Sequence, residues 1–274
     1  MTGQMTVPLP GGGQINARID GPQDAPLVVF SNSVATDLSI WKNQVAALSD
    51  RYRVLCYDQR GHGASSVSRG LMSFDDYGAD LLALLEACNV TTCTFVGLSM
   101  GAPTGLAALT ARPELFGAFV VVDGVARSGS GREAFWTERR ATARSEGMSR
   151  IASDTVVRWL PGVDAEAQNA QVLSVMIAAT PVEGYAAATQ ALQSYDYSAV
   201  LPSLTCPFLG IAGEKDGAMP ETIRAQFAPV PNAQFAEIPG AGHVPNFQDP
   251  DAFNAALLAF LDVHAAADKS KEPR

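Results

Sequence analysis

The chain has 274 residues, of which 47% are apolar and only 17% are charged. This composition is typical of a globular protein with a large core and unlike that of a disordered or fibrous one. The formal net charge of -9 argues against a nucleic-acid partner, because phosphate binding depends on clustered lysine and arginine. The first residues do not show the basic segment followed by an apolar one that is typical of a leader peptide, and the sequence has no apolar run long enough to span a bilayer. It therefore predicts no membrane partner and a cytoplasmic location.

The first two elements are predicted to form a hairpin. Residues 6–9 and 14–19 flank a glycine turn, Gly11-Gly12-Gly13, which favours an antiparallel pair. Short runs rich in valine and phenylalanine follow, and their length and composition are typical of strands buried on both faces. These runs occupy residues 27–30, 52–57, 93–98, 118–122 and 208–212.

Helix-like stretches separate the predicted strands, at residues 75–88, 102–111, 220–227 and 251–264. This alternation indicates a mostly parallel central sheet flanked by helices. It breaks at about residue 127, where an alanine-rich helical region begins and continues to about residue 197. We therefore expect an α/β core (residues 1–126 and 198–264), a helical cap insertion (residues 127–197) and a flexible tail (residues 265–274).

The four cysteines, Cys56, Cys88, Cys93 and Cys206, occur singly, without a C-x-x-C pair or clustered histidines. We expect buried apolar side chains rather than disulfides or metal ligands. The sequence thus predicts no metal and no cofactor, and it gives no indication of the oligomeric state.

The most informative motif is Gly97-Leu98-Ser99-Met100-Gly101, a G-x-S-x-G between a predicted strand and a predicted helix. That context is typical of a nucleophile elbow, in which flanking glycines allow a turn tight enough to expose the serine. The pattern predicts Ser99 as a nucleophile at the carboxyl edge of the sheet. A serine needs a base to take its proton, so a histidine is expected later in the chain.

His243 is the best candidate for that base, because it lies in a loop (Pro239-Gly240-Ala241-Gly242-His243) after a strand-like segment. Asp216 follows the buried strand at residues 208–212 and is our first choice for the acid that orients the imidazole. Asp123, at the end of the strand at residues 118–122, is the rival acid and is otherwise expected to line the active site.

Two backbone N–H groups should stabilise the oxyanion of a tetrahedral intermediate. Met100 follows the nucleophile and supplies the first. Ser33, in the loop Ser31-Asn32-Ser33-Val34, is our choice for the second, with Val34 as the alternative. The segment Asp58-Gln59-Arg60-Gly61-His62-Gly63 gathers polar side chains but is interpreted as a structural turn.

Several segments together resemble the 3-oxoadipate enol-lactonase group of α/β-hydrolases, over most of the chain and including the cap. The G-x-S-x-G motif and the Arg60-Gly61-His62-Gly63 turn are common to the superfamily. More specific are the Ser31-Asn32-Ser33 loop and Ala179-Thr180-Pro181-Val182-Glu183-Gly184-Tyr185. The resemblance implies an α/β-hydrolase fold and a triad of Ser99, Asp216 and His243 that opens a carboxylate-bearing lactone during breakdown of aromatic compounds.

The sequence departs from that group at Val34-Ala35, Ala102 and His243-Val244-Pro245. Val34 and Val244 are therefore expected to border the pocket. A carboxylate would suit an arginine from the start of the cap, and Arg127 is the first of five there, before Arg132, Arg139, Arg140 and Arg144. Trp136 and Trp159 are expected either to wall the pocket or to pack the cap onto the sheet.

The leading hypothesis is a serine hydrolase that cleaves a small ester or lactone through an acyl-enzyme. A hydrolase of C–C bonds in ring-cleavage products would use the same triad, and a perhydrolase side activity stays open. A small-molecule receptor on the same fold is the alternative from another class. A haloalkane dehalogenase is disfavoured, because its nucleophile would be an aspartate where this chain has Ser99.

Overall fold

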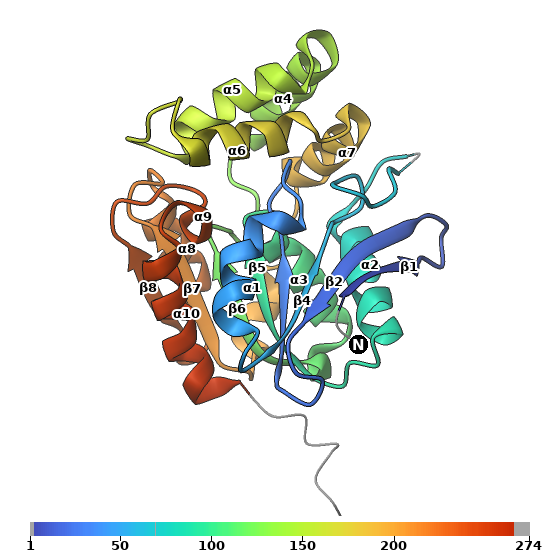
Figure 1. Cartoon of the computed structure of the whole chain (residues 1–274), viewed down its shortest axis with the longest axis vertical. Coiled ribbons are helices and arrows are strands. Elements are labelled where there is room, and N and C mark those ends of the chain that lie inside the picture. The colour runs from blue at the N-terminus through green and yellow to red at the C-terminus, as the bar shows by residue number, and fades with distance from the viewer. Residues whose placement is uncertain (1–2, 69, 266–274) are drawn as a thin grey trace, which may run out of the picture.

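The computed structural model describes residues 3–68 and 70–265 and confirms the predicted fold class (Figure 1). The eight strands form one sheet in the order β1-β2-β4-β3-β5-β6-β7-β8. Strands β3 to β8 run parallel, whereas the β1–β2 hairpin is antiparallel and pairs with β4. The strands are β1 (Gly3–Pro8), β2 (Gln14–Asp20), β3 (Leu27–Ser31), β4 (Arg53–Tyr57), β5 (Cys93–Leu98), β6 (Phe116–Val122), β7 (Phe208–Gly213) and β8 (Gln234–Ile238).

Two apolar clusters cover the two faces of the sheet, because alternate residues of each strand point to opposite sides. Val120 and Val122 of β6 belong to one cluster and Val121 to the other. Helices α1 and α10 contribute to the first, and α2, α3 and α8 mainly to the second. The bounds of these and of the short α9 are α1 (Lys42–Leu48), α2 (Phe74–Ala87), α3 (Gly101–Ala111), α8 (Met219–Phe227), α9 (Pro245–Gln248) and α10 (Pro250–His264).

Four α-helices lie between β6 and β7 in the chain and form a layer over the carboxyl edge of the sheet (Figure 1). An isolated bridge between Arg127 and Asp196 joins the two ends of this insert. The first apolar cluster continues from the sheet into the insert, with Trp159 and Leu173 among its members. The helices are α4 (Arg132–Glu146), α5 (Met148–Trp159), α6 (Gln168–Ala178) and α7 (Val182–Gln193).

Within the described residues, no single helix has the length and apolar character needed to cross a membrane. Helices α6 and α7 meet that criterion only as a pair, which is bent by 93° at the junction. Of the predicted tail, residues 266–274 lie outside the described part of the chain.

The turn after β4 is held by buried polar contacts. The Asp58 carboxylate accepts hydrogen bonds from Asn16 Nδ2 (2.7 Å) and from the backbone N–H groups of Leu38 (2.7 Å) and Ala64 (2.9 Å). Arg60 forms a two-point ion pair with Asp80 on α2. His62 is fully buried, and its Nδ1 lies 3.1 Å from the Arg60 carbonyl oxygen. These contacts fit a structural turn.

Burial of His62 should make the stability of the protein depend on acidic pH. Burial lowers the pKa of His62 from 6.5 to about 4, against smaller opposing effects of backbone hydrogen bonds. Between these pH values the unfolded chain binds a proton that the folded protein excludes. The free energy of unfolding should therefore fall as the pH drops from about 6.5 towards 4, by roughly 3 kcal/mol from this residue.

We expect His62→Gln to remove this part of the pH dependence in urea unfolding experiments across that range. His264→Gln, which changes a partly exposed histidine at the end of α10, should keep the wild-type dependence. A His62→Gln variant with the same slope as the wild type would show that His62 is not buried as a neutral imidazole.

Candidate active site

Ser99 occupies a tight turn between β5 and α3. Its backbone has φ = +51°, a left-handed conformation that is unusual for a residue with a side chain. The turn needs glycine on both sides: a Cβ at Gly97 would lie 2.6 Å from the backbone of Gly101, and one at Gly101 would collide with the Ser31 carbonyl. The Ser99 N–H donates to the Val122 carbonyl at 2.8 Å. The turn presents Ser99 at the carboxyl edge of the sheet.

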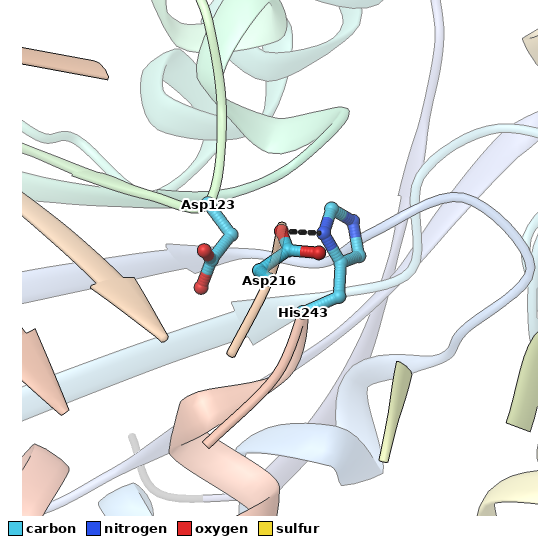
Figure 2. A group of neighbouring side chains, drawn as sticks. All are labelled: Asp123, Asp216 and His243. Carbon is cyan, nitrogen blue, oxygen red and sulfur yellow. Dashed lines mark hydrogen bonds and ion pairs between the residues drawn. The ribbon is translucent and has the colours of Figure 1, made fainter. Parts of the chain in front are cut away.

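The loops after β7 and β8 bring Asp216 and His243 to the same edge. His243 Nε2 lies 3.0 Å from Ser99 Oγ, and His243 Nδ1 lies 2.6 Å from Asp216 Oδ2 (Figure 2 shows the second contact). The insert also holds the imidazole, because the His243 N–H donates to the Trp159 carbonyl at 3.1 Å and the two rings lie 5.0 Å apart. A hydroxyl, an imidazole and a carboxylate are thus linked in sequence.

The environment of Asp216 favours its charged form. Burial raises the pKa of this carboxyl, but attraction to His243 and the hydrogen bond with it outweigh that effect, and smaller contributions from Asp123 and Arg158 act in the same direction. The net pKa of Asp216 is lower than usual. It is therefore an anion at neutral pH, able to stabilise a protonated His243.

Asp123 lies close to this pair but bonds differently. Both of its carboxyl oxygens accept from the Gly213 N–H, at 3.1 and 3.2 Å, whereas the carboxylate that accepts from His243 Nδ1 is that of Asp216 (Figure 2). The Asp123 side chain is fully enclosed. Burial and then repulsion by Asp216 raise its pKa well above the ordinary value.

These three residues also offer oxygen and nitrogen atoms that all lie within 4.8 Å of one another, a donor set that metals use. The 2.6 Å separation between His243 and Asp216 is a hydrogen-bond distance that leaves no space for an ion between those two atoms. The arrangement fits proton transfer better than metal binding.

A cavity of about 170 Å³ opens beside Ser99. Of the residues expected in the pocket, Val34, Asp123, Trp136 and Trp159 line it. Further lining residues, which the sequence did not single out, come from the insert and from the loops after β6 and β7: Gly124, Val125, Arg158, Leu192, Tyr195 and Met219.

Two residues expected at the pocket lie elsewhere. Arg127 is exposed, and its backbone is bound to Gln226 and bridged to Asp196 at the base of the insert. Val244, which directly follows His243, is completely buried in the apolar core at the start of α9. Neither lines the cavity beside Ser99.

Arg132 from α4 and Arg158 from α5 are the two arginines that do line the cavity. Both guanidinium groups lie near the Phe135 ring, at 4.8 and 5.2 Å. Within the described residues, neither forms an ion pair or a hydrogen bond. Burial lowers the pKa of both, and repulsion from Arg139 and Arg132 adds to this effect at Arg158. In the described part of the chain, the two guanidinium groups thus border the cavity without an ion pair to Asp216, the anion that also lines it.

The other arginines near the start of the insert are engaged elsewhere. Arg139 donates to Thr155 and to the Ile151 carbonyl, and Arg144 forms an ion pair with Glu183. Arg140 borders a separate surface hollow. Arg158 was missed by the sequence analysis, although a single charge within Val156-Val157-Arg158-Trp159-Leu160 is a signal that could have indicated it.

The backbone around Ser99 places candidate donors for an oxyanion. Met100 is fully buried at the N-terminal end of α3, where backbone N–H groups and the helix dipole favour negative charge. On the facing loop, Val34 lines the cavity and Ser33 does not. Of the two residues expected to supply the second donor, Val34 is thus the one that borders the cavity beside Ser99.

Comparison with known proteins identifies the family of the chain. The profile of the alpha/beta hydrolase family matches residues 28–256. The chain belongs to this family. This α/β hydrolase is 35% identical to 3-oxoadipate enol-lactonase 2 of Acinetobacter baylyi, over 90% of this chain and 92% of the relative. It is 29% identical to a protein of Pantoea ananatis named putative carbamate hydrolase RutD, over 89% and 90% of the two chains.

Among solved structures, this α/β hydrolase resembles the enol-lactonase from Burkholderia xenovorans LB400. The TM-score is 0.88 and the identity 33%, over 94% of this chain and all of the other. The resemblance to enol-lactonases predicted from the sequence is thereby confirmed. These relatives support an enzyme that hydrolyses esters or lactones.

Proposed function

We propose that this enzyme hydrolyses a small lactone that carries a carboxylate, through an acyl-enzyme formed on Ser99. The observation that supports the substrate class is the pair of unpaired guanidinium groups, Arg132 and Arg158, in the cavity that holds Ser99. Both arginines are exposed to solvent where they border the cavity, and a carboxylate of the substrate would pair with their guanidinium groups through charge-assisted hydrogen bonds. The names of the lactonase relatives point to the same class, with 3-oxoadipate enol-lactone as the leading candidate.

The chemistry follows the chain of hydrogen bonds. Ser99 Oγ attacks the lactone carbonyl while His243 Nε2, at 3.0 Å, takes its proton. Asp216 stabilises the imidazolium through Nδ1. The Met100 N–H, and an N–H of the loop at Ser33 or Val34, bind the oxyanion. The imidazolium then protonates the enolate that leaves, and a water activated by His243 releases the acid and restores Ser99.

The shape of the cavity suits a compact, flat substrate. Its volume of about 170 Å³ is small, and Trp136, Trp159 and Tyr195 provide aromatic walls. An unsaturated lactone ring packs favourably on aromatic faces, while the arginines contact a carboxylate at one end. A long acyl chain would not fit in this space.

The test compares two substrates with the same lactone ring, one with a free carboxymethyl group and one with its methyl ester. We expect Arg132→Gln and Arg158→Gln each to raise KM for the free acid roughly 10- to 100-fold, since hydrogen bonds to charged groups contribute about 1.5–3 kcal/mol. KM for the methyl ester should change by no more than about threefold in the same variants.

Arg150→Gln is the matched control, because Arg150 lies on α5 but pairs with Glu146 and Asp154 outside the cavity. It should behave like the wild type with both substrates. Equal KM values for the acid in the wild type and both cavity variants would contradict the carboxylate site. Turnover of the methyl ester in preference to the acid would contradict the substrate class.

A further inference from the structure

Asp123 is a buried carboxyl that the proposed reaction does not use. It ends β6 with φ = +41°, a left-handed conformation that is rare for a residue with a side chain. Its side chain is enclosed, and its carboxyl lies beside the pair formed by Asp216 and His243 (Figure 2). An ionisable group on a strained backbone next to proposed catalytic groups indicates a functional role.

We propose that Asp123 is a positioning residue, a carboxyl that stays protonated at neutral pH and fixes Asp216 so that the pair holds one negative charge beside His243. This inference rests on the proposed function, because it concerns the same triad. In this proposal Asp123 does not touch the reacting atoms. It acts through Asp216 and through the loop on which Asp216 lies.

The first argument concerns charge. Oxygen atoms of Asp123 and Asp216 and a nitrogen of His243 all lie within 4.8 Å of one another. Two ionised carboxylates so close together in a buried site repel strongly, so one of them keeps a proton. Asp216 has the better environment for a charge, since it bonds to His243 at 2.6 Å and its side chain is partly exposed. The proton therefore belongs to Asp123.

The second argument concerns position. The Asp123 carboxyl holds the Gly213 N–H at the end of β7, and the Gly213 carbonyl accepts from the Asp216 N–H at 3.0 Å. Gly213 also lies so close to the Gly242 carbonyl that a Cβ there would collide with it. Asp123 thus fastens the turn that carries Asp216 against the loop that carries His243.

Protonation of Asp123 also matters for the base. A second negative charge beside the imidazole would favour its protonated form, which cannot accept a proton from Ser99. The raised pKa of Asp123, caused by burial and then by Asp216, supports this argument. The titratable or charged groups around Asp123 in the cavity come from the loops after β7 and β8 and from the insert: Asp216, His243, Arg132, Arg158 and Tyr195.

The experiment compares Asp123→Asn and Asp123→Leu in the full chain, with the wild type and Ser99→Ala, by recording kcat and KM for p-nitrophenyl acetate from pH 5 to 9. Asparagine resembles a protonated carboxyl, because it keeps both a carbonyl for Gly213 and a donor for Asp216. Leucine is similar in size to aspartate but has neither the acceptor for Gly213 nor the donor for Asp216. We expect kcat of Asp123→Leu to fall about tenfold or more with little change in KM, and Asp123→Asn to recover most of that loss.

The acid limb of the kcat/KM profile tests the charge directly. If Asp123 is protonated, Asp123→Asn removes no charge, and the limb should match that of the wild type. A limb that shifts to lower pH by about half a unit or more would show that Asp123 is ionised, and this would overturn the proposal. Undiminished kcat in Asp123→Leu would also overturn it.

If Asp123→Leu does not fold, the profile of Asp123→Asn still decides the charge. Difference infrared spectra of the wild type against Asp123→Asn at pH 7 provide an independent readout. They should show the carbonyl band of a protonated carboxylic acid, and a carboxylate band in its place would overturn the proposal. Activity that persists in Ser99→Ala would instead contradict the proposed function, so the two failures are distinguishable.

Discussion

Replacement of Ser99 by alanine should lower kcat for ester and lactone substrates by at least about 10⁴-fold, because it removes the proposed nucleophile. The hydroxyl lies 3.0 Å from His243 Nε2 and faces the cavity. Binding contacts are unchanged in this variant, so Kd for a substrate analogue should stay within about threefold of the wild type. Steady-state kinetics and calorimetric binding measure the two quantities.

Ser153→Ala is the matched control for this prediction, because Ser153 lies exposed on α5 and bonds only to the Arg150 carbonyl of its own helix in the described part of the chain. It should retain wild-type kinetics. A fluorophosphonate probe should label the wild type at Ser99 and leave Ser99→Ala unlabelled. Labelling at another serine, or hydrolysis that survives in Ser99→Ala, would exclude the proposed mechanism.

Replacement of Asp216 by asparagine should lower kcat by about 10³- to 10⁴-fold. The Asp216 carboxylate accepts a hydrogen bond from His243 Nδ1 at 2.6 Å, which fixes the tautomer with a free Nε2. An amide in its place can present its N–H₂ to Nδ1 and so favour the wrong tautomer, and it removes the charge that stabilises the imidazolium. Substrate KM should change much less than kcat, and the two are separated by steady-state kinetics.

Asp50→Asn removes a carboxylate from an exposed position and should leave both constants as in the wild type. If Asp123 were the acid of the triad, Asp216→Asn would lose little activity and Asp123→Asn would lose most of it. The structure leads us to expect the reverse order, because the imidazole bonds to Asp216. A loss below about tenfold in Asp216→Asn would refute this assignment.

Most of the parallel sheet could be predicted because its strands carry the signal of burial on both faces. Strand β5 matches the predicted residues 93–98, and every residue in it is buried. Helix α1 gave no such signal: it has seven residues, and the side chain of its N-cap residue, Trp41, makes no capping bond. Leu48 of this helix lies in the buried core, and the helix contacts α10, which are tertiary contacts that local sequence does not encode.

The candidate triad could be predicted for a similar reason, since each member lies in the turn or loop that follows a recognisable strand. The pocket residues could not be predicted equally well. Arg127 and Arg158 are both arginines of the insert, yet only Arg158 points into the cavity. The difference depends on how α5 packs over the sheet, which a sequence pattern does not reveal. The same holds for Val34 and Ser33, where one step along a loop decides which residue lines the cavity.

The contact between Trp159 and His243 sets a limit on redesign. The arginines proposed to select the substrate lie on α4 and α5, whereas the groups proposed to break the bond lie outside the insert. A protein engineer could therefore exchange α4 to change selectivity and leave the proton path intact. The end of α5 is different, because its Trp159 carbonyl holds the His243 backbone. A transplanted insert would need to supply that carbonyl at the same place, or the new selectivity would come with a misplaced base.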